Sequence, residues 1–142
     1  MKAAYIERHG GPEVLQFGEM PDPVAAPGEV VVDIAAASVN GADWKVREGK
    51  SGQLSRFPYI LGRDFSGVVS AVGDGVTDLH VGDEVFAVCD VGQEGAYAEK
   101  IAIKAAIACS LLRPFQRTRK TSLPRKWRDS LTLCAATASL SR

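Results

Sequence analysis

The sequence LGRDFSGVVSAVG, from Leu61 to Gly73, decides the fold of this chain. An apolar run from Phe65 to Val72 lies between glycines and leads into the turn residues Gly73-Asp74-Gly75. A second apolar run, from Val81 to Val88, follows almost at once. Short apolar runs bounded by glycine and aspartate are typical of neighbouring β-strands. The stretch therefore predicts two strands joined by a tight connection.

The same pattern continues outward from this stretch in both directions. Further strands are predicted over residues 2–8, 14–20, 30–39 and 95–103. In the second of these, Val14, Leu15 and Phe17 are expected in the core, and the nearly continuous apolar run of residues 30–39 favours a strand covered on both faces. Many short strands separated by Gly- and Pro-rich connectors indicate a mainly β fold, either a barrel or a sandwich.

A sharp change in composition divides the chain near residue 108. Residues 1–108 contain nine Lys and Arg against sixteen Asp and Glu, whereas residues 109–142 contain eight Lys and Arg against one Asp. All 14 glycines lie at or before Gly95. We therefore expect one folded domain over residues 1–108, followed by a basic tail over residues 109–142 that is irregular or weakly helical.

The basic tail has two interpretations. Its Lys and Arg side chains are of the kind that binds phosphates, so a nucleic-acid partner is one of them. The other is a segment that never evolved as part of a fold, and the abrupt loss of glycine and of acidic residues favours it. Nucleic acid is therefore the least favoured partner.

Other patterns bear on location and on metal binding. The three cysteines lie far apart in the sequence and form no disulfide framework. The N-terminus does not read as a signal peptide, because Glu7 and Arg8 interrupt the apolar run, and no run approaches the roughly 18 apolar residues of a membrane helix. The sequence contains neither a zinc-ligand motif nor the dinucleotide fingerprint GxGxxG. We expect a cytoplasmic protein without a membrane segment and without a metal site.

The polar loop of residues 38–49 is the strongest candidate for binding chemistry. Asn40 follows the strand of residues 30–39, and its side chain offers both donors and an acceptor to a sugar hydroxyl or a carboxamide. A ligand role and a turn role are equally supported for Asn40. For Asp43 the favoured role is capping of the short helical turn that follows, through backbone N–H groups that bond to its carboxylate.

Two further residue types permit either a cleft or an ordinary structural role. Arg63 precedes a strand and suits a ligand cleft or a surface ion pair with an aspartate, of which the surface pair is commoner. The aromatic residues Trp44, Tyr59 and Phe65 could line a flat pocket, although such residues more often belong to the core.

Taken together, the ordered motifs of residues 1–104 resemble a known family. They are similar to the N-terminal, GroES-like domain of medium-chain dehydrogenases/reductases, in the zinc-free quinone oxidoreductase (zeta-crystallin-like) branch. The matching motifs are GGPEVL at residues 10–15, PGEVVV at 27–32, SVNGAD at 38–43, PYILGRD at 58–64, VGDEV at 81–85 and GAYAE at 95–99.

This resemblance implies a partly open β-barrel and NADPH-dependent hydride transfer to a quinone or an α,β-unsaturated carbonyl. It places Asn40 at the nicotinamide side of the cleft, and it makes Trp44 and Arg63 candidates for the substrate cleft. Zinc-dependent relatives use Cys where Ser38 stands and His-Glu where Arg63-Asp64 stand, so no zinc is expected. The chemistry would then depend on cofactor placement and on hydrogen bonds around the acceptor oxygen.

The resemblance ends near Ala108, whereas the family continues into a Rossmann domain and then returns to complete the catalytic domain. We hypothesise a frameshift or truncation, which a reading of the other frames downstream would test. The expected function is that of a partial quinone or enone reductase that is inactive alone. The alternative is a non-enzymatic β-barrel module that binds or self-associates through unpaired strand edges.

Overall fold

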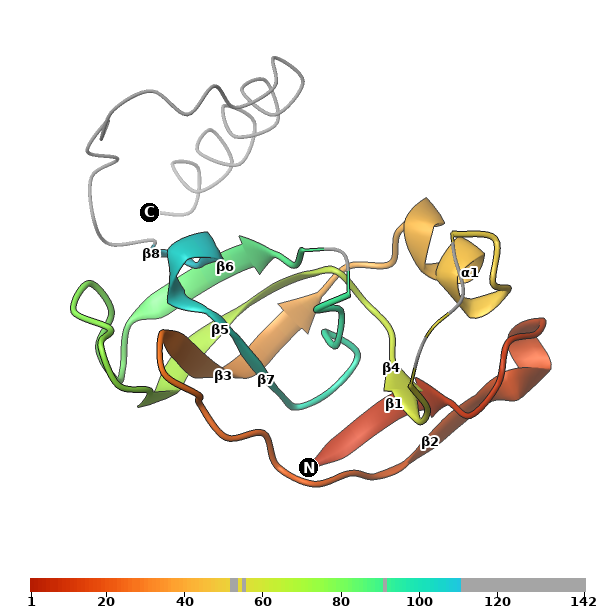
Figure 1. Ribbon diagram of the computed structural model, residues 1–142, viewed down its shortest axis with the longest axis horizontal. Helices are drawn as coiled ribbons and strands as arrows, with labels where there is room; N and C mark the ends of the chain where they lie inside the picture. The colour runs from red at the N-terminus through yellow and green to blue at the C-terminus, as the bar shows by residue number, and fades with distance from the viewer. Residues whose placement is uncertain (52–53, 55, 91, 111–142) are drawn as a thin grey trace, which may run out of the picture.

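A computed structural model describes residues 1–51, 54, 56–90 and 92–110. These residues form two open sheets, with strand orders β2-β1-β4 and β7-β3-β5-β6-β8, and one α-helix, α1 (Figure 1). The predicted mainly β fold is confirmed, and within the described ranges the sheets do not close into one barrel. The prediction for the tail lies outside the described residues from 111 onward.

The smaller sheet is built around the N-terminal strand. β1 (Lys2–Ile6) pairs antiparallel with β2 (Leu15–Glu19) and with β4 (Tyr59–Ile60), and a 3₁₀ turn, Pro12–Val14, leads into β2. The strands predicted over residues 2–8 and 14–20 are thus present, each somewhat shorter than expected.

The core assignment for the predicted strand of residues 14–20 is wrong for two of its three residues. Val14 is buried, but Leu15 is 42% exposed and Phe17 is 74% exposed. The physical reason is that β2 is the edge strand of a three-stranded sheet, so its side chains pack against a neighbour on one side only. The apolar pattern alone does not reveal this edge position.

The larger sheet contains the pair of strands predicted from the opening stretch. It comprises β3 (Glu29–Ala37), β5 (Asp64–Val72), β6 (Glu84–Val88), β7 (Lys100–Lys104) and β8 (Cys109–Ser110), all paired antiparallel. β6 begins three residues later than expected because Gly82 has a positive φ of 96° and the His80 carbonyl accepts the Asp83 N–H in a turn. β7 likewise begins at Lys100 and not at Gly95.

β3 is covered on both faces only along its first half. Val30, Val31 and Val32 are buried, whereas Ala35, Ala36 and Ala37 are exposed. β7 pairs with β3 only from Glu29 to Asp33, and the β3–β5 register shifts between Ile34 and Ala36. The expectation of a strand buried throughout is therefore wrong for the C-terminal half of β3.

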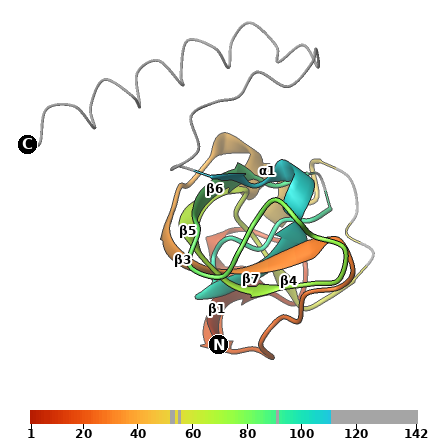
Figure 2. The same cartoon turned by 90° about the vertical axis from the view of Figure 1, so that its left-hand side faces the viewer.

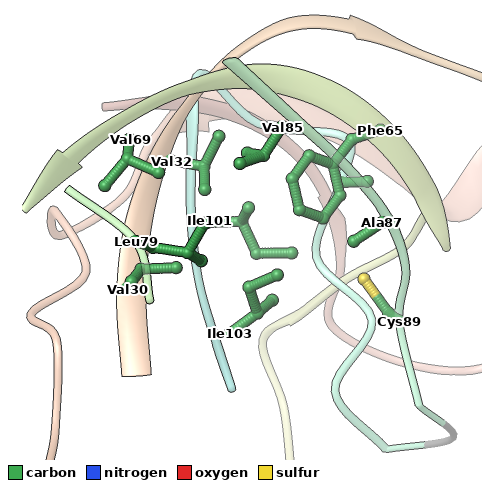
Figure 3. Packing of buried hydrophobic residues seen from close by; sticks show 11 residues of the cluster. Val30, Val32, Phe65, Val69, Leu79, Val85, Ala87, Cys89, Ile101 and Ile103 are labelled. Atoms are coloured by element: carbon green, nitrogen blue, oxygen red, sulfur yellow. The ribbon is translucent and has the colours of Figure 1, made fainter. Parts of the chain in front are cut away.

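Apolar side chains from four strands fill the concave face of the larger sheet. The strands of this sheet curve in Figure 2, and Figure 3 shows the side chains pointing toward one another inside that curve. The fully buried side chains there are Val30, Val32, Val85 and Ile103. Burial of each one stabilises the fold by roughly 1.5–3 kcal/mol. A second, smaller cluster, Ile6 with Val14 and Leu61, lies against the smaller sheet.

The route of the chain after β3 places the candidate residues at one end of the larger sheet. α1 (Gly41–Arg47) follows β3 after only three residues, and the Ser38 N–H donates to the Asp64 carbonyl over 3.2 Å. The end of β3, the start of β5 and the first turn of α1 therefore meet (Figure 1). No helix in the described part of the chain is long and apolar enough to cross a membrane.

Candidate functional site

Three polar side chains converge where β3 ends and β5 begins. The Asn40 amide nitrogen donates to Asp64 Oδ2 over 2.9 Å and to Ser38 Oγ over 3.0 Å. The Ser38 hydroxyl in turn donates to Asp64 Oδ2 over 3.0 Å. We call Ser38, Asn40 and Asp64 the Asn40 cluster. Because Asp64 Oδ2 receives bonds from both other members, this oxygen fixes the positions of their side chains.

Asn40 is also the residue from which α1 begins. Its backbone is extended, with φ −115° and ψ 155°, as expected of a helix N-cap. The Asp43 carboxylate accepts the backbone N–H of Asn40 over 2.7 Å. The capping role predicted for Asp43 is therefore confirmed, and the turn role considered for Asn40 is present as well.

The other end of α1 is closed by a glycine-dependent motif. Gly49 has a positive φ of 74°, and its N–H donates to the Val46 carbonyl, while the Lys50 N–H donates to the Lys45 carbonyl. These two bonds form a Schellman motif, which satisfies carbonyl groups that the helix leaves free. Both ends of the seven-residue helix are thus fixed, so the Asn40 cluster lies next to a defined element and not a loose loop.

Asp43 has a second partner that the sequence did not reveal. It is only 4% exposed, and its Oδ2 accepts a hydrogen bond from the Tyr97 hydroxyl over 2.7 Å. Burial, followed by the bond to Asp43, raises the pKa of Tyr97 above its usual value, so the hydroxyl stays protonated and donates. Asp43 Oδ1 has no hydrogen-bond partner within the described residues. Tyr97 thereby ties α1 to the segment that leads into β7.

Arg63 lies beside the cluster in sequence but makes different contacts. Its guanidinium Nη2 donates to the Cys89 carbonyl over 3.1 Å, and the Cys89 N–H donates to the Arg63 carbonyl over 2.7 Å. The surface ion pair favoured from sequence is not found among the described residues. The Arg63 side chain instead bonds to the backbone carbonyl of Cys89, the residue that follows β6. Arg63 Nε is buried and has no partner in the same set of residues.

The aromatic residues proposed for a flat pocket separate in the structure. Phe65 is buried in the core, Tyr59 is half-buried with its hydroxyl bonded to Glu94, and Trp44 is 41% exposed on α1. The Lys45 and Lys50 ammonium groups lie 5.7 and 5.0 Å from the centre of the Trp44 ring. The core interpretation is therefore confirmed for Phe65 and wrong for Trp44.

Residues 26–112 match the protein family described as the alcohol dehydrogenase GroES-like domain. The chain belongs to this GroES-like domain family. Its relatives include the quinone oxidoreductase of Lama guanicoe, which is 35% identical over 100 residues that make up 70% of this chain and 30% of that protein. The resemblance to quinone oxidoreductases of the medium-chain dehydrogenase/reductase family is thus confirmed.

Solved structures show the same relationship for the GroES-like domain. The Escherichia coli quinone oxidoreductase complexed with NADPH is 33% identical and has a TM-score of 0.73, over 78% of this chain and 33% of that one. The quinone oxidoreductase from Coxiella burnetii is 28% identical, with a TM-score of 0.74 over 96% of this chain and 44% of that one. This chain spans about 30% of the length of the curated quinone oxidoreductases that it matches.

An open groove borders the Asn40 cluster, since Ala37, which precedes Ser38, and Tyr97, which bonds to Asp43, are among its lining residues. It has a volume of about 430 Å³ and is lined by small residues of β1 and β3, by Phe17 and by residues 96–99. None of the predicted site residues Asn40, Trp44 and Arg63 lines it. The ligand roles of these three residues therefore stay predictions.

Proposed function

We propose that this GroES-like domain forms the substrate side of an NADPH-dependent reductase that acts on a quinone or an α,β-unsaturated carbonyl. The observation that carries the proposal is the Asn40 cluster, in which hydrogen bonds orient a carboxamide at the start of a capped helix. The NADPH complex of the Escherichia coli relative supports the choice of cofactor.

The residues present fit the nicotinamide end of such a cofactor. Asn40 is half-exposed, its amide nitrogen donates to Ser38 and Asp64, and its side-chain oxygen accepts the Asp43 backbone N–H in the capping box of α1, so the carboxamide is held in one orientation at the surface. When bound, NADPH supplies a hydride. This chain would bind the nicotinamide end through Asn40, and α1 would form one side of the binding site. Catalysis would then depend on the placement of cofactor and substrate rather than on a resident zinc ion.

We also propose that the 142-residue chain needs a nucleotide-binding unit to turn over substrate. It spans about 30% of its quinone oxidoreductase relatives, and its sequence contains no GxGxxG fingerprint for the pyrophosphate. The expected result is therefore no quinone-dependent NADPH oxidation above a blank without protein. Steady turnover by the chain alone would contradict this part of the proposal. Trp44 and Arg63 remain proposed contacts for substrate, and a cytoplasmic location stays a prediction.

Binding of a cofactor fragment tests the proposal directly. In a ¹H–¹⁵N spectrum of the chain, nicotinamide mononucleotide should shift signals of Asn40 and of the first turn of α1. Adenosine monophosphate, which lacks the nicotinamide, is the matched ligand control and should leave them unchanged. The substitution Asn40→Ala should abolish the nicotinamide response. Shifts confined to other regions of the chain would refute the proposed placement.

A second candidate function rests on the exposed apolar face of β2. Leu15 and Phe17 are exposed on an edge strand, and such strands pair readily with other chains. This favours a self-associating module as the alternative. Sedimentation over a range of concentrations would show a dimer that Phe17→Lys abolishes, whereas Val24→Lys, at an exposed apolar residue outside β2, would leave it intact. A strictly monomeric chain would exclude this alternative.

A further inference from the structure

His9 lies where three segments of the chain meet. It follows the end of β1 by three residues, and its ring packs against Gly49, where an added Cβ would lie only 3.2 Å from the ring. The Phe57 ring meets it edge-on, with 5.3 Å between the ring centres. We propose that His9 is a pH-sensitive switch, in which the neutral ring holds the Leu54 backbone at the end of α1 and protonation of the ring releases it. The inference does not depend on the proposed reductase function.

The partners of the two ring nitrogens determine the tautomer of His9. Nδ1 lies 3.1 Å from the Val46 carbonyl oxygen and 3.2 Å from the Arg47 carbonyl oxygen. Because a carbonyl oxygen only accepts hydrogen bonds, Nδ1 must carry the proton. The Leu54 N–H donates to Nε2 over 3.4 Å, so Nε2 must be the nitrogen without a proton. The neutral ring has one donor and one acceptor, and both are used.

Protonation changes these two sets of contacts in opposite ways. The new hydrogen is added to Nε2, which becomes a donor that faces the N–H donor of Leu54, so this hydrogen bond is lost. Nδ1 remains a donor to the Val46 and Arg47 carbonyls in the last turn of α1. A positive charge is favourable near the C-terminus of a helix. The charged ring therefore stays bound to α1 and loses only the Leu54 contact.

The segments around His9 carry several charged side chains, but none of them forms an ion pair with it in the part of the chain that the structure describes. These side chains are Glu7, Arg8, Glu13, Arg47, Glu48, Lys50 and Arg56. Each of the three carboxylates among them accepts hydrogen bonds from, or forms ion pairs with, residues other than His9. The contacts that change on protonation are therefore those of the two ring nitrogens.

Release of the Leu54 backbone would affect the smaller core cluster. The half-buried Leu54 side chain packs against the cluster of Ile6, Val14 and Leu61. The hydrogen bond to His9 helps to keep this side chain in place, because it fixes the backbone from which the side chain extends. Acid should therefore loosen the smaller cluster around Leu54, whereas the main core of the larger sheet has no contact with the switch.

Hydrogen exchange of the Leu54 amide measures the switch on the full 142-residue chain. Protection is expressed relative to the intrinsic exchange rate and followed from pH 8 to pH 5, the range of about three pH units in which histidine side chains change charge. It should fall about threefold to tenfold toward the acid end, as expected for the loss of one hydrogen bond, and in step with the imidazole NMR signals of His9. Constant protection while His9 titrates would overturn the inference, and so would a ring that stays neutral throughout.

Two substitutions separate His9 from other causes of a pH response. His80→Gln is the matched control, because His80 is exposed and is the other histidine of the chain, and it should keep the response of Leu54. His9→Asn keeps an N–H donor near the place of Nδ1 but has no counterpart of Nε2, so Leu54 protection should be low at every pH. A response that persists in H9N or disappears in H80Q would overturn the inference. If H9N fails to fold, agreement between the Leu54 response and the His9 signals in H80Q decides.

Discussion

The Tyr97 hydroxyl lies 2.7 Å from Asp43 Oδ2 and joins two residues that are 54 positions apart in the sequence. Asp43 belongs to the first turn of α1, and Tyr97 belongs to the segment that precedes β7. The bond satisfies a carboxylate that is buried and whose other oxygen has no partner among the residues described. It therefore secures α1, the helix whose N-cap is Asn40.

Removal of this bond should destabilise the domain. Tyr97→Phe leaves the Asp43 carboxylate buried with one donor fewer, which should lower the free energy of unfolding by about 1–3 kcal/mol. Urea denaturation measures the change. Tyr5→Phe is the matched control, because no hydrogen bond from the Tyr5 hydroxyl is found in the described ranges, and its effect should stay within about 0.5 kcal/mol. Equal stability of Y97F and the wild type would show that the bond contributes nothing.

A proline at the first position of α1 should stabilise the chain. Gly41 is the first helical residue, where proline loses no hydrogen bond, and Asn40 before it already has the extended backbone that proline requires. An added side chain at Gly41 would meet nothing closer than Trp44 Nε1 at 3.9 Å. Gly41→Pro should therefore raise the free energy of unfolding by about 0.4–1 kcal/mol in urea titrations. A loss of stability would mean that α1 begins elsewhere.

Truncation in the main core should be far more costly than truncation at the surface. Ile103 of β7 is completely buried within the cluster shown in Figure 3, so Ile103→Ala should cost about 2–5 kcal/mol in thermal or urea unfolding. Val24 is 85% exposed, and Val24→Ala should change stability by less than about 0.5 kcal/mol. Similar costs at both positions would contradict the assigned core.

Stability should fall in alkaline solution because of a buried thiol. Burial, followed by the charges of Glu94 and Asp64, raises the pKa of Cys89 from 9.0 to about 11. An acid whose pKa is higher in the fold than in the unfolded chain stabilises the fold below the unfolded value. This contribution, about 2–3 kcal/mol, should be present below pH 9 and be lost as the pH rises through 11.

The measurement is the free energy of unfolding at a series of pH values, in the presence of a reductant. Cys89→Ala serves as the comparison, since it removes the thiol from the core and keeps the burial and the hydrogen bonds that raise the pKa of Tyr59 and of Tyr97. Its stability should fall less steeply over the same pH range. An identical alkaline loss in both proteins would assign the effect to the tyrosines instead.

Some features of the structure could be predicted from the sequence and others could not. Strand β5 and its partner β6 could be predicted, because glycines and aspartates near their ends in the sequence indicate where each strand begins or stops. The exposure of Phe17 could not, since it depends on β2 lying at the edge of its sheet. The Arg63 contact was also missed, because its acceptor is a backbone carbonyl, at Cys89, that carries no sequence signal.

The sequence by itself determined the mainly β fold, the pairing of β5 with β6 and the membership of the GroES-like family, because these depend on local patterns of apolar residues, glycines and ordered motifs. Only the tertiary structure decided how the candidate site is built. The orientation of the Asn40 carboxamide depends on Asp64, which is 24 residues away, and the burial of Asp43 depends on Tyr97. Such contacts form only when segments distant in the sequence come together. The pattern of neighbouring residues therefore does not show which side chains will bond to each other.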